Sequence, residues 1–495
     1  MKGLKQMKKT SMNSTAFCVC LCMLLLSCGS QDVQSSDTQT AAERTSPVTE
    51  TATEELTDGL ENIDFNKADF NIVYSADQLG SSWPYDAEAE TGDLLNDSVY
   101  KRNHTVMERF NVNVNYVSTG GTGDEVPNAL MKSVKSGDNA YHLAISHTYA
   151  SVPAMLTDGY LADFNTIPNI DISKPWWNAS IRNNLSICGV LPIAVSDLVY
   201  SYADVIYVNH DMIESYDLEN TYDLVESGKW TWSKLAEMAE IVATDLNGDG
   251  KPSDGDIFGY TTPGETPSLM SRIVQSNGML MASSDDDGVQ LLTVSDRLQN
   301  AFERYYSLLY DGAKTYIGTV TGDKESVASF ISGNILFMHQ TTLQLPKMRD
   351  TDVNFGIVPL PKYDETQENY QSMLSSQILL IPSSLDDEMR EYVGTITEAL
   401  SYESWKTVTP AVYNTIFENK YLRDATSYEM YQMIRSSLVC DFNWNYGNGN
   451  ELTSMAIKLL KDQKSTDVAS YLAKYSEKIA VSYEKLTDAV KEIYD

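Results

Sequence analysis

Short apolar runs alternate with helix-like stretches along most of this 495-residue chain, and this alternation constrains the fold more than any other feature. Three early runs are predicted strands: FNIVY (Phe70–Tyr74), VNVNYV (Val112–Val117) and YHLAIS (Tyr141–Ser146). Helices are expected at residues 97–110, 128–134 and 152–158. Strands that alternate with helices predict α/β units with largely parallel sheets.

The later part of the chain repeats this pattern. Thr231 and Ser295 are predicted helix N-caps, because apolar residues at helical spacing follow each of them. The residues expected on the inner faces are Trp232, Leu235, Met238, Ala239 and Val242 in the first helix, and Leu298, Phe302, Tyr305 and Leu309 in the second, which should end at Asp311-Gly312. ILFMH (Ile335–His339) and QILLIP (Gln377–Pro382) are expected buried strands, and the C-terminal segment predicts a helix with Val468, Leu472, Tyr475, Ile479 and Leu486 on one stripe.

The N-terminus has the organisation of an export signal. Four lysines precede the apolar run Phe17–Leu26, which is shorter than the about 20 residues that a membrane-spanning helix needs. Leu25-Leu26-Ser27-Cys28 resembles the lipobox of bacterial lipoproteins, in which the cysteine receives a diacylglyceryl group before cleavage. We therefore expect residues 1–27 to be a signal peptide and Cys28 to carry acyl chains, palmitate among them, that hold the protein on the outer face of the cytoplasmic membrane. An ordinary secretion signal with an incidental Cys28 is the alternative.

Residues 28–63 are predicted to form a disordered tether. Gly29–Asn62 is rich in Ser, Thr, Glu and Gln, has no aromatic residue and shows no apolar periodicity, so it cannot bury enough surface to fold. Cys188 and Cys440 are the only cysteines beyond this region and have no metal-ligand spacing. Two buried free thiols are expected, and one disulfide remains open in an exported protein.

The charge of the mature chain limits its partners. Cleavage before Cys28 removes four lysines and no acids, which leaves 32 basic against 69 acidic residues and a formal net charge of −37. Such a surface repels nucleic acids and most anionic ligands, so neutral or cationic solutes are favoured.

Six segments together resemble the extracellular solute-binding proteins of ABC importers, in the sugar-type group related to maltose-binding proteins. They are ISKPWWN (Ile172–Asn178), LPIAVSDLVYSYADVIYVNHDMIE (Leu191–Glu214), YDLVESGKWTWSKLAEMAE (Tyr222–Glu240), FISGNILFMHQ (Phe330–Gln340), VNFGIVPLPKYD (Val353–Asp364) and YLRDATSYEMYQMI (Tyr421–Ile434). Each segment is a weak signal, but their order behind a lipobox and a tether is specific. The resemblance covers nearly all of the chain after the tether.

This resemblance implies a periplasmic-binding-protein-like fold of type II, with two α/β lobes joined by a hinge and a ligand cleft between them. Crossovers are expected just after IAVSD (Ile193–Asp197), near Val289–Ser295 and around Lys362–Tyr370. Residues 64–198 and 297–362 would then form lobe 1, and residues 199–296 and 363–495 lobe 2. The expected protein is a monomer whose partners are a carbohydrate ligand and the permease subunits of an ABC importer.

The segment DLNGDGKPSDGD (Asp245–Asp256) matches the spacing of a calcium-binding loop. Its oxygen ligands would be Asp245, Asn247, Asp249, the Lys251 carbonyl, Ser253 and Asp256. Asp256 is shorter than the usual glutamate, the loop is single, and a strand rather than a helix is expected after it. A calcium sensor is therefore not expected, and the resemblance implies the same, since related proteins often carry a similar segment at this place. A structural Ca²⁺ site and an acidic turn that binds no metal both remain open.

Ligand contacts are expected where strands end, because ligands of open α/β sheets lie at the carboxyl ends of strands. This rule selects Trp83, His147, Tyr149, Thr261, Thr262, His339 and Gln340. The resemblance adds Asp197, near the place where related proteins often have a ligand-contacting acid, and Asp441 and Trp444 precede the final helices. Aromatic faces with carboxylates, amides and hydroxyls are the groups that bind sugars. For each residue, packing or loop stabilisation is the alternative.

Four further tryptophans stand in two pairs. Trp176 and Trp177 could line the cleft or pack a lobe, whereas Trp230 and Trp232 begin a helix and are expected to be structural.

Two other classes of function compete with an importer subunit. A secreted glycan-acting enzyme could hide a carboxylate pair among the 69 acids, but the sequence has no H-E-x-x-H or G-x-S-x-G motif and no histidine cluster, so no catalysis is expected. A surface adhesin with the same fold would fit the anchor and tether equally well. We expect a binding protein for an oligosaccharide or glycoside, with a peptide or another small solute as the alternative ligand.

Overall fold

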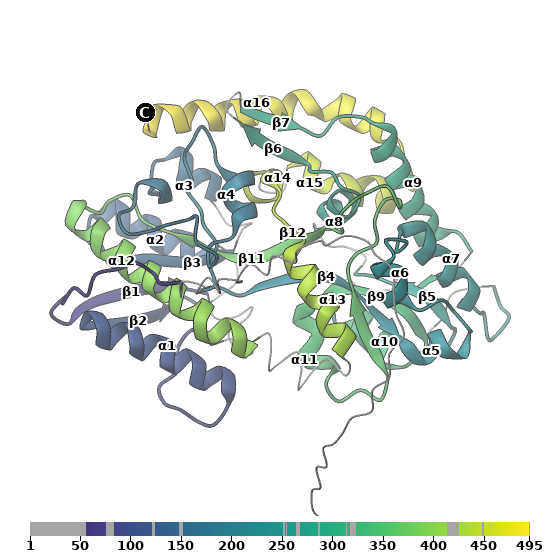
Figure 1. Ribbon diagram of the computed structural model, residues 1–495. Coiled ribbons are helices and arrows are strands. Elements are labelled where there is room, and N and C mark those ends of the chain that lie inside the picture. The colour runs from purple at the N-terminus through teal and green to yellow at the C-terminus, as the bar shows by residue number, and fades with distance from the viewer. Residues whose placement is uncertain are drawn as a thin grey trace, which may run out of the picture. The chain divides into compact units, whose positions relative to one another are not determined.

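Two central strands, β4 (Ser201–Asn209) and β11 (Ser372–Leu380), connect the two ends of a ten-stranded sheet (Figure 1). The strand order is β2-β1-β3-β11-β4-β9-β5-β8, with β10 beside β4 and β12 beside β11. This computed structural model describes residues 56–75, 84–120, 124–147, 152–250, 253, 255–263, 268–285, 288–312, 314–316, 323–412, 425–447 and 450–494. Thr57–Asp495 forms one compact unit.

The first lobe is built on three parallel strands. Its elements are β1 (Ala68–Tyr74), β2 (Val112–Ser118), β3 (Leu143–His147), α1 (Leu94–Phe110), α2 (Glu125–Ser136), α3 (Val152–Thr157), α4 (Ala179–Leu185) and α12 (Asp387–Glu403). β1 pairs in parallel with β2 and with β3, and the carboxyl-terminal half of β11 closes this end of the sheet. α1 packs against α12, and α2 packs against β1 and β3.

The second lobe continues the sheet beyond β4. Its elements are β5 (Phe258–Thr261), β8 (Thr315–Tyr316), β9 (Ile335–Thr341), β10 (Phe355–Val358), α5 (His210–Ser215), α6 (Thr221–Glu226), α7 (Trp232–Val242), α8 (Leu269–Ser276), α9 (Asp296–Tyr310), α10 (Asp323–Ile331), α11 (Leu345–Met348) and α13 (Ala425–Ser436). β5 pairs in parallel with β8 and β9, and β4 pairs antiparallel with β9 and β10. α7 packs on β5, α10 on β9 and α13 on β10.

The hinge is the antiparallel pairing of β4 with β11. Leu374–Ser376 of β11 pairs with Ser201–Ala203 of β4, and the following Gln377–Leu380 pairs antiparallel with β3. β11 is thus a strand of both lobes. The expectation of largely parallel sheets holds for β1 with β2 and β3, and for β5 with β8 and β9. It is wrong for β4 and β11, which pair antiparallel with their neighbours β3, β9 and β10 and with each other, since the direction of a long-range pairing is not visible in a local apolar pattern.

The strand pairings also correct the expected division into lobes. Residues 297–362 were expected in lobe 1, but β9 and β10 lie in this segment and pair with β4 of the second lobe. Residues 377–403 were expected in lobe 2, but this end of β11 pairs with β3, and α12 packs against α1. Val289–Ser295 is not a crossover, because α9, which follows it, packs on α7 and α8. Crossovers depend on which distant segments pair, and no local pattern encodes that.

Local structure follows the sequence closely where helix caps and periodicity are clear. The side chains of Thr231 and Ser295 accept hydrogen bonds from Lys234 N and Leu298 N, so both predicted N-caps are confirmed. All five residues expected on the inner face of α7 are buried, as are the four expected on α9. Cys188 and Cys440 are free thiols, of which Cys440 is buried and Cys188 half-buried.

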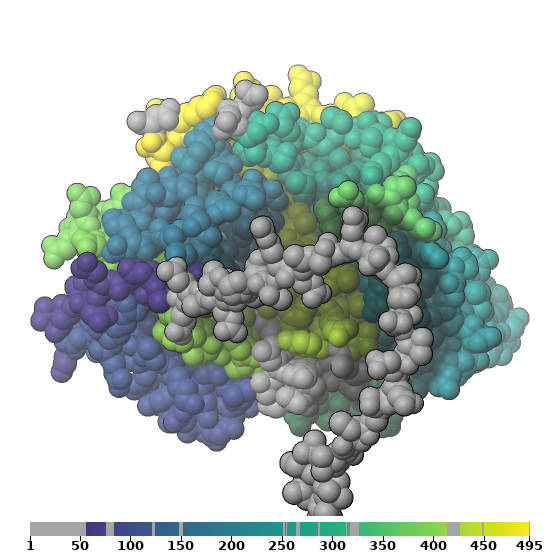
Figure 2. All heavy atoms as spheres, in the orientation of Figure 1, coloured from purple at the N-terminus to yellow at the C-terminus, as the bar shows by residue number. Residues whose placement is uncertain are grey.

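The C-terminal helices and a hairpin connect the two lobes a second time. These elements are β6 (Ala282–Asp285), β7 (Gly288–Leu291), β12 (Leu438–Val439), α14 (Phe442–Tyr446), α15 (Glu451–Ala456) and α16 (Val468–Tyr494). α16 packs on α9 and β7 and also on α3 of the first lobe, and it forms the top edge of the molecule in Figure 2. The hydroxyl of Tyr494 donates to the carbonyl of Leu161 at 2.6 Å. No helix in the described part of the chain has both the length and the apolarity to cross a bilayer.

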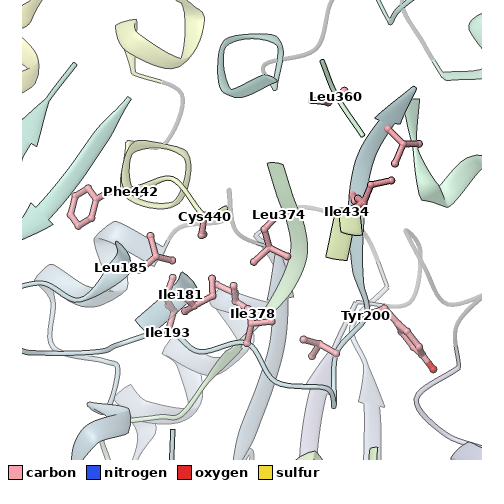
Figure 3. Close-up of a cluster of buried hydrophobic side chains, with 14 of the residues drawn as sticks. Ile181, Leu185, Ile193, Tyr200, Leu360, Leu374, Ile378, Ile434, Cys440 and Phe442 are labelled. Atoms are coloured by element: carbon pink, nitrogen blue, oxygen red, sulfur yellow. The ribbon is translucent and has the colours of Figure 1, made fainter. Parts of the chain in front are cut away.

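The hinge is surrounded by an apolar cluster that draws on both lobes (Figure 3). Ile181, Leu185 and Ile193 come from the first lobe, whereas Ile434 belongs to α13. Leu374 and Ile378 of β11 lie between them, and all of these side chains are almost completely buried. Each buried aliphatic side chain of this size contributes about 1.5–3 kcal/mol. The hinge is therefore packed like a core, and not like a linker.

One buried carboxylate organises the first lobe. Nε1 of Trp176 donates to Oε1 of Glu398 on α12 at 2.8 Å, and Nε1 of Trp177 donates to Oε2 at 2.8 Å. Both indoles are less than 5 % exposed, so this pair packs the lobe. Trp230 and Trp232 are structural as expected: their Nε1 atoms donate to the Pro359 carbonyl at 2.8 Å and to Ser276 Oγ at 3.1 Å.

The Glu398 carboxylate should make folding stability depend on pH. Burial raises the pKa of Glu398 to about 7, although the two indole hydrogen bonds oppose the shift. Because the folded state holds the proton more tightly, the stability that this proton contributes is complete below the unfolded pKa and is lost as the pH rises through about 7. The loss is roughly 3 kcal/mol. In urea unfolding between pH 4.5 and 8, Glu398→Gln should flatten the pH dependence by this amount, and Glu391→Gln on the exposed side of α12 should not. An unchanged slope in Glu398→Gln would contradict the assignment.

Candidate functional site

Four tyrosines gather at the carboxyl ends of β1 and β2, beside the start of β4. Tyr74 ends β1, Tyr116 lies near the end of β2, Tyr85 follows β1, and Tyr200 directly precedes β4. Ring centroids of Tyr74 and Tyr85 are 5.7 Å apart, those of Tyr74 and Tyr116 6.2 Å, and those of Tyr85 and Tyr200 5.7 Å. These distances are typical of interacting aromatic pairs. The strand-end rule, which selected other residues, missed this tyrosine cluster, although FNIVY and VNVNYV both place a tyrosine at or near the strand end.

Buried polar groups fix the cluster. The Tyr85 hydroxyl donates to Oε1 of Gln377 on β11, and Nη2 of Arg102 donates to the Tyr85 carbonyl and, at 3.1 Å, to the Tyr116 hydroxyl. Arg102 and Gln377 are almost completely buried. Nε2 of Gln377 has no acceptor, and the Tyr74 hydroxyl has no hydrogen-bond partner, among the described residues. The cluster thus combines aromatic faces with hydrogen-bonding groups that the protein itself leaves unused.

A buried charged network lies at the corresponding end of the second lobe. Asp204, near the start of β4, forms an ion pair with Arg272 on α8, and the Asp204 Oδ1–Arg272 Nε distance is 2.9 Å. Nε2 of His339 on β9 lies 3.6 Å from the same carboxylate oxygen, and the Tyr260 hydroxyl lies 3.1 Å from His339 Nδ1. Burial would raise the pKa of Asp204, but Arg272 and His339 lower it, and the net pKa lies below the ordinary value. Burial lowers the pKa of His339, so its imidazole is neutral at pH 7.

This network ties α8 to the hinge. α8 follows the carboxyl end of β5, and Asp204 directly follows Ala203, the last β4 residue that pairs with β11. Because an isolated buried charge is very costly, the Asp204–Arg272 pair holds α8 in one position against β4.

The histidines, threonines and glutamine selected from strand ends are all buried inside the protein. His147 pairs with Gln377 across β3 and β11, and burial lowers its pKa to about 4. Oγ1 of Thr261 donates to the Tyr316 carbonyl at 3.0 Å, and Nε2 of Gln340 donates to Ser326 Oγ at 2.9 Å. His339 and Gln340 are neighbours on β9 but face opposite sides of the sheet, and Thr262, like the others, is almost fully buried. Contact of these residues with a ligand stays a prediction.

Asp197 occupies the passage from the first lobe to β4. Its side chain is half-buried, and its backbone N–H donates to the Trp176 carbonyl at 2.9 Å. Burial raises the pKa of Asp197 to about 7, while Arg435 on α13 and the Thr409 hydroxyl lower it. The carboxyl group therefore lies between side chains of different segments, as a residue in an interlobe site would. Its role in ligand binding stays a prediction.

Asp441 and Trp444 belong to a structural arrangement in α14. Asp441 caps this helix, since Oδ1 accepts from Trp444 N at 3.1 Å, and Oδ2 accepts from Met281 N at 2.6 Å. Both carboxylate oxygens are thus committed to backbone N–H groups, and burial raises the pKa of Asp441 to about 7. The two remaining predicted ligand residues, Trp83 and Tyr149, lie outside the described residues, as does Cys28.

The predicted calcium loop closes on its own hydrogen bonds. Asp245 accepts from Gly248 N and Gly250 N, both at 2.7 Å, and Asn247 Oδ1 accepts from Asp249 N at 2.8 Å. Asp256 accepts from Leu246 N at 3.0 Å and from Ser253 N and Oγ at 2.8 and 2.9 Å. Among the described residues, which exclude Lys251, three or more Asp, Glu, His or Cys side chains nowhere gather as metal ligands would. The first and last carboxylates accept hydrogen bonds from the loop itself, and Ca²⁺ binding by this loop stays a prediction.

Comparisons with known proteins identify a family from the sequence and a fold from the structure. Residues 104–410 match the family model described as bacterial extracellular solute-binding protein. No curated protein matches the sequence. Among the solved structures with a similar fold is an ABC substrate-binding protein of Listeria monocytogenes in complex with cycloalternan, at 14 % identity and a TM-score of 0.50, over 86 % of this chain and 98 % of that one. Maltose-bound MalE3 of T. maritima matches at 14 % identity and a TM-score of 0.51, over 86 % of this chain and 99 % of that one. The cyclic α-maltosyl-1,6-maltose binding protein of Arthrobacter globiformis matches at 12 % identity and a TM-score of 0.53, over 86 % of this chain and 100 % of that one. Their likeness confirms the predicted two-lobed α/β fold.

The Asp204–Arg272 pair should be much more costly to break than an exposed pair. Arg272→Met leaves the Asp204 carboxylate buried without its main partner, so the free energy of unfolding should fall by about 3–5 kcal/mol. Lys234→Met removes an exposed pair with Glu219 and Glu237 and should cost under about 1 kcal/mol. In urea unfolding, the double variant Asp204→Asn, Arg272→Met should cost less than the two single changes added together. Additive costs would show that the two side chains act independently.

A variant of the predicted calcium loop can show whether Asp256 stabilises the protein by accepting hydrogen bonds or by binding Ca²⁺. Asp256→Ala removes the acceptor of three hydrogen bonds, and we expect a loss of about 1–3 kcal/mol that is the same in Ca²⁺ and in EDTA. Thermal unfolding of the wild type and the variant in both buffers measures this. A Ca²⁺-dependent rise in the wild-type unfolding temperature that disappears in Asp256→Ala would establish the calcium site.

Proposed function

This chain belongs to the bacterial extracellular solute-binding proteins, and we propose that it is the substrate-binding lipoprotein of an ABC importer for an oligosaccharide or glycoside. The observation that carries the proposal is the shared hinge. β4 and β11 join two lobes, and the carboxyl ends of parallel strands in each lobe face this hinge. Such a pair of lobes can close on a solute between them and present it to a membrane permease.

The tyrosine cluster supports a carbohydrate as the ligand. Tyr74 and Tyr116 are half-buried, so their rings are only partly covered by the protein, and flat aromatic faces stack on the apolar faces of sugar rings. The unused donor of Gln377 and the free Tyr74 hydroxyl can pair with sugar hydroxyls. A strongly acidic surface also favours a neutral solute over an anion. The proteins with similar structures include binders of cycloalternan and maltose.

The remaining parts of the proposal concern location and chemistry. Acyl chains on Cys28 would hold the protein, as a monomer, at the outer face of the cytoplasmic membrane, and Gly29–Asn62 would let the folded unit reach the permease. Membrane fractionation of cells that carry Cys28→Ala measures the anchor, because the variant should leave the membrane fraction. No chemical change of the ligand is part of the proposal, since the matched family is one of solute-binding proteins.

Thermal unfolding with a panel of sugars tests the ligand. A bound sugar at a hundredfold excess over its Kd should add about 2.7 kcal/mol of stability, and cyclic and linear gluco-oligosaccharides are the first members of the panel. Tyr74→Leu should weaken binding of the active sugar by about tenfold, because about 1–1.5 kcal/mol of aromatic contact is lost. Tyr306→Leu on α9 of the second lobe is the control and should bind normally.

The panel also separates the alternatives. Stabilisation by peptides and not by any sugar would replace the carbohydrate with a peptide ligand. If chromatography shows that the protein releases shorter glycans from the sugar that stabilises it, the protein is an enzyme. Binding without any change in the radius of gyration on ligand addition would favour an adhesin over an importer subunit.

A further inference from the structure

A cavity lies in the second lobe, and none of the four clustered tyrosines lines it. It has a volume of about 450 Å³ and is enclosed by the turn after α6, the loop that precedes β11, and the junction of α13 with β12. Its polar lining consists of Glu226, Lys362, Glu368, Asn369, Gln371, Ser436 and Ser437. None of these residues was selected as a ligand residue from the sequence, and none belongs to the charged network of Asp204.

Lys362 is the unusual residue of this cavity. Its backbone is fixed, because Lys362 N donates to the Trp230 carbonyl at 3.0 Å and its own carbonyl accepts from Trp232 N at 3.1 Å. The residue is only 3 % exposed. Nζ donates to the Gln367 carbonyl at 2.8 Å and lies 5.2 Å from the centre of the Tyr370 ring. No carboxylate of the described residues lies within ion-pair distance of this ammonium group.

A buried ammonium group without a carboxylate is costly, and lysines are seldom buried without a partner. The ammonium group has three donors, of which the Gln367 carbonyl uses one. Gly228 keeps the approach to this group open, because a Cβ at Gly228 would lie 3.2 Å from Nζ. The cavity therefore offers a positive charge with unused donors to an anionic group from outside.

The other polar groups of the cavity limit which kind of ligand can bind there. The exposed carboxylates of Glu226 and Glu368 line the same cavity and would repel a simple anion, but they would attract an ammonium group. The amide groups of Asn369 and Gln371 add neutral donors and acceptors. A ligand with a carboxylate at one end and an ammonium group near it satisfies both charges.

We propose that this cavity is a second ligand site that binds a small zwitterion of the α-amino acid class. The ligand carboxylate pairs with Lys362 Nζ, and the ligand ammonium group faces Glu226 and Glu368. The site is separate from the carbohydrate site, so either can fail without the other.

Titration calorimetry on the full-length lipoprotein in detergent tests the site, with glycine, L-alanine and L-glutamine as probes. At least one amino acid should bind, and Lys362→Met should weaken its binding by tenfold or more. Lys314→Met is the matched control, because Lys314 is also a buried lysine of this lobe but pairs with Glu240. It should leave amino-acid binding unchanged, and all variants should keep the wild-type affinity for the active sugar.

Three results would overturn the proposal: no heat with any of the three amino acids, equal binding by Lys362→Met, or acetate binding as tightly as the best amino acid. If Lys362→Met does not fold, Asn369→Leu takes its place. The Asn369 side chain is exposed, so this variant should keep the wild-type circular dichroism spectrum and lose affinity for the amino acid several-fold. Unchanged affinity in Asn369→Leu would also overturn the proposal.

Discussion

Both lobes depend on the antiparallel pairing of β4 with β11. Leu374–Ser376 pairs with Ser201–Ala203, and Ser201 Oγ donates to Ser376 Oγ at 3.2 Å. Buried backbone groups must keep their hydrogen bonds, so the lobes cannot separate at these residues without a large cost. Neighbouring segments can still twist, because β11 turns to β3 and β4 turns to β9 immediately beyond the shared rungs. A short, packed hinge of this kind permits rotation of the lobes and opposes their separation.

Each lobe has its own buried carboxyl group with fixed partners. In the first lobe, Glu398 holds the indoles of Trp176 and Trp177, and in the second lobe Asp204 holds Arg272. A buried carboxyl group is costly unless its partners keep their hydrogen-bond geometry. Glu398 and Asp204 therefore favour one packing arrangement of the side chains inside each lobe. Rigid lobes on a shared hinge move as bodies, and a ligand between them then selects the closed arrangement by its contacts to both.

The sequence predicts local structure and family better than it predicts the site. Thr231 and the inner face of α7 follow from caps and periodicity, which depend on residues a few positions apart. The division into lobes was wrong for residues 297–362, because β9 pairs with β4 across more than a hundred residues. His339 was a sensible ligand candidate at a strand end, yet Tyr260 and Asp204 surround it. The tyrosine cluster was not predicted, because only the folded sheet brings Tyr74 and Tyr200 into one cluster.

α16 limits how the lobes can move. Its first turns lie near α15, where the Tyr471 hydroxyl donates to the Glu451 carbonyl at 2.8 Å, and its last turn reaches the first lobe, where Tyr494 donates to Leu161. A movement that drew α3 away from α9 would break contacts at one end of this helix, since a continuous helix does not stretch. A rotation about an axis close to α16 keeps both ends in contact and costs little. The hinge strands and α16 together therefore oppose any movement that separates the lobes.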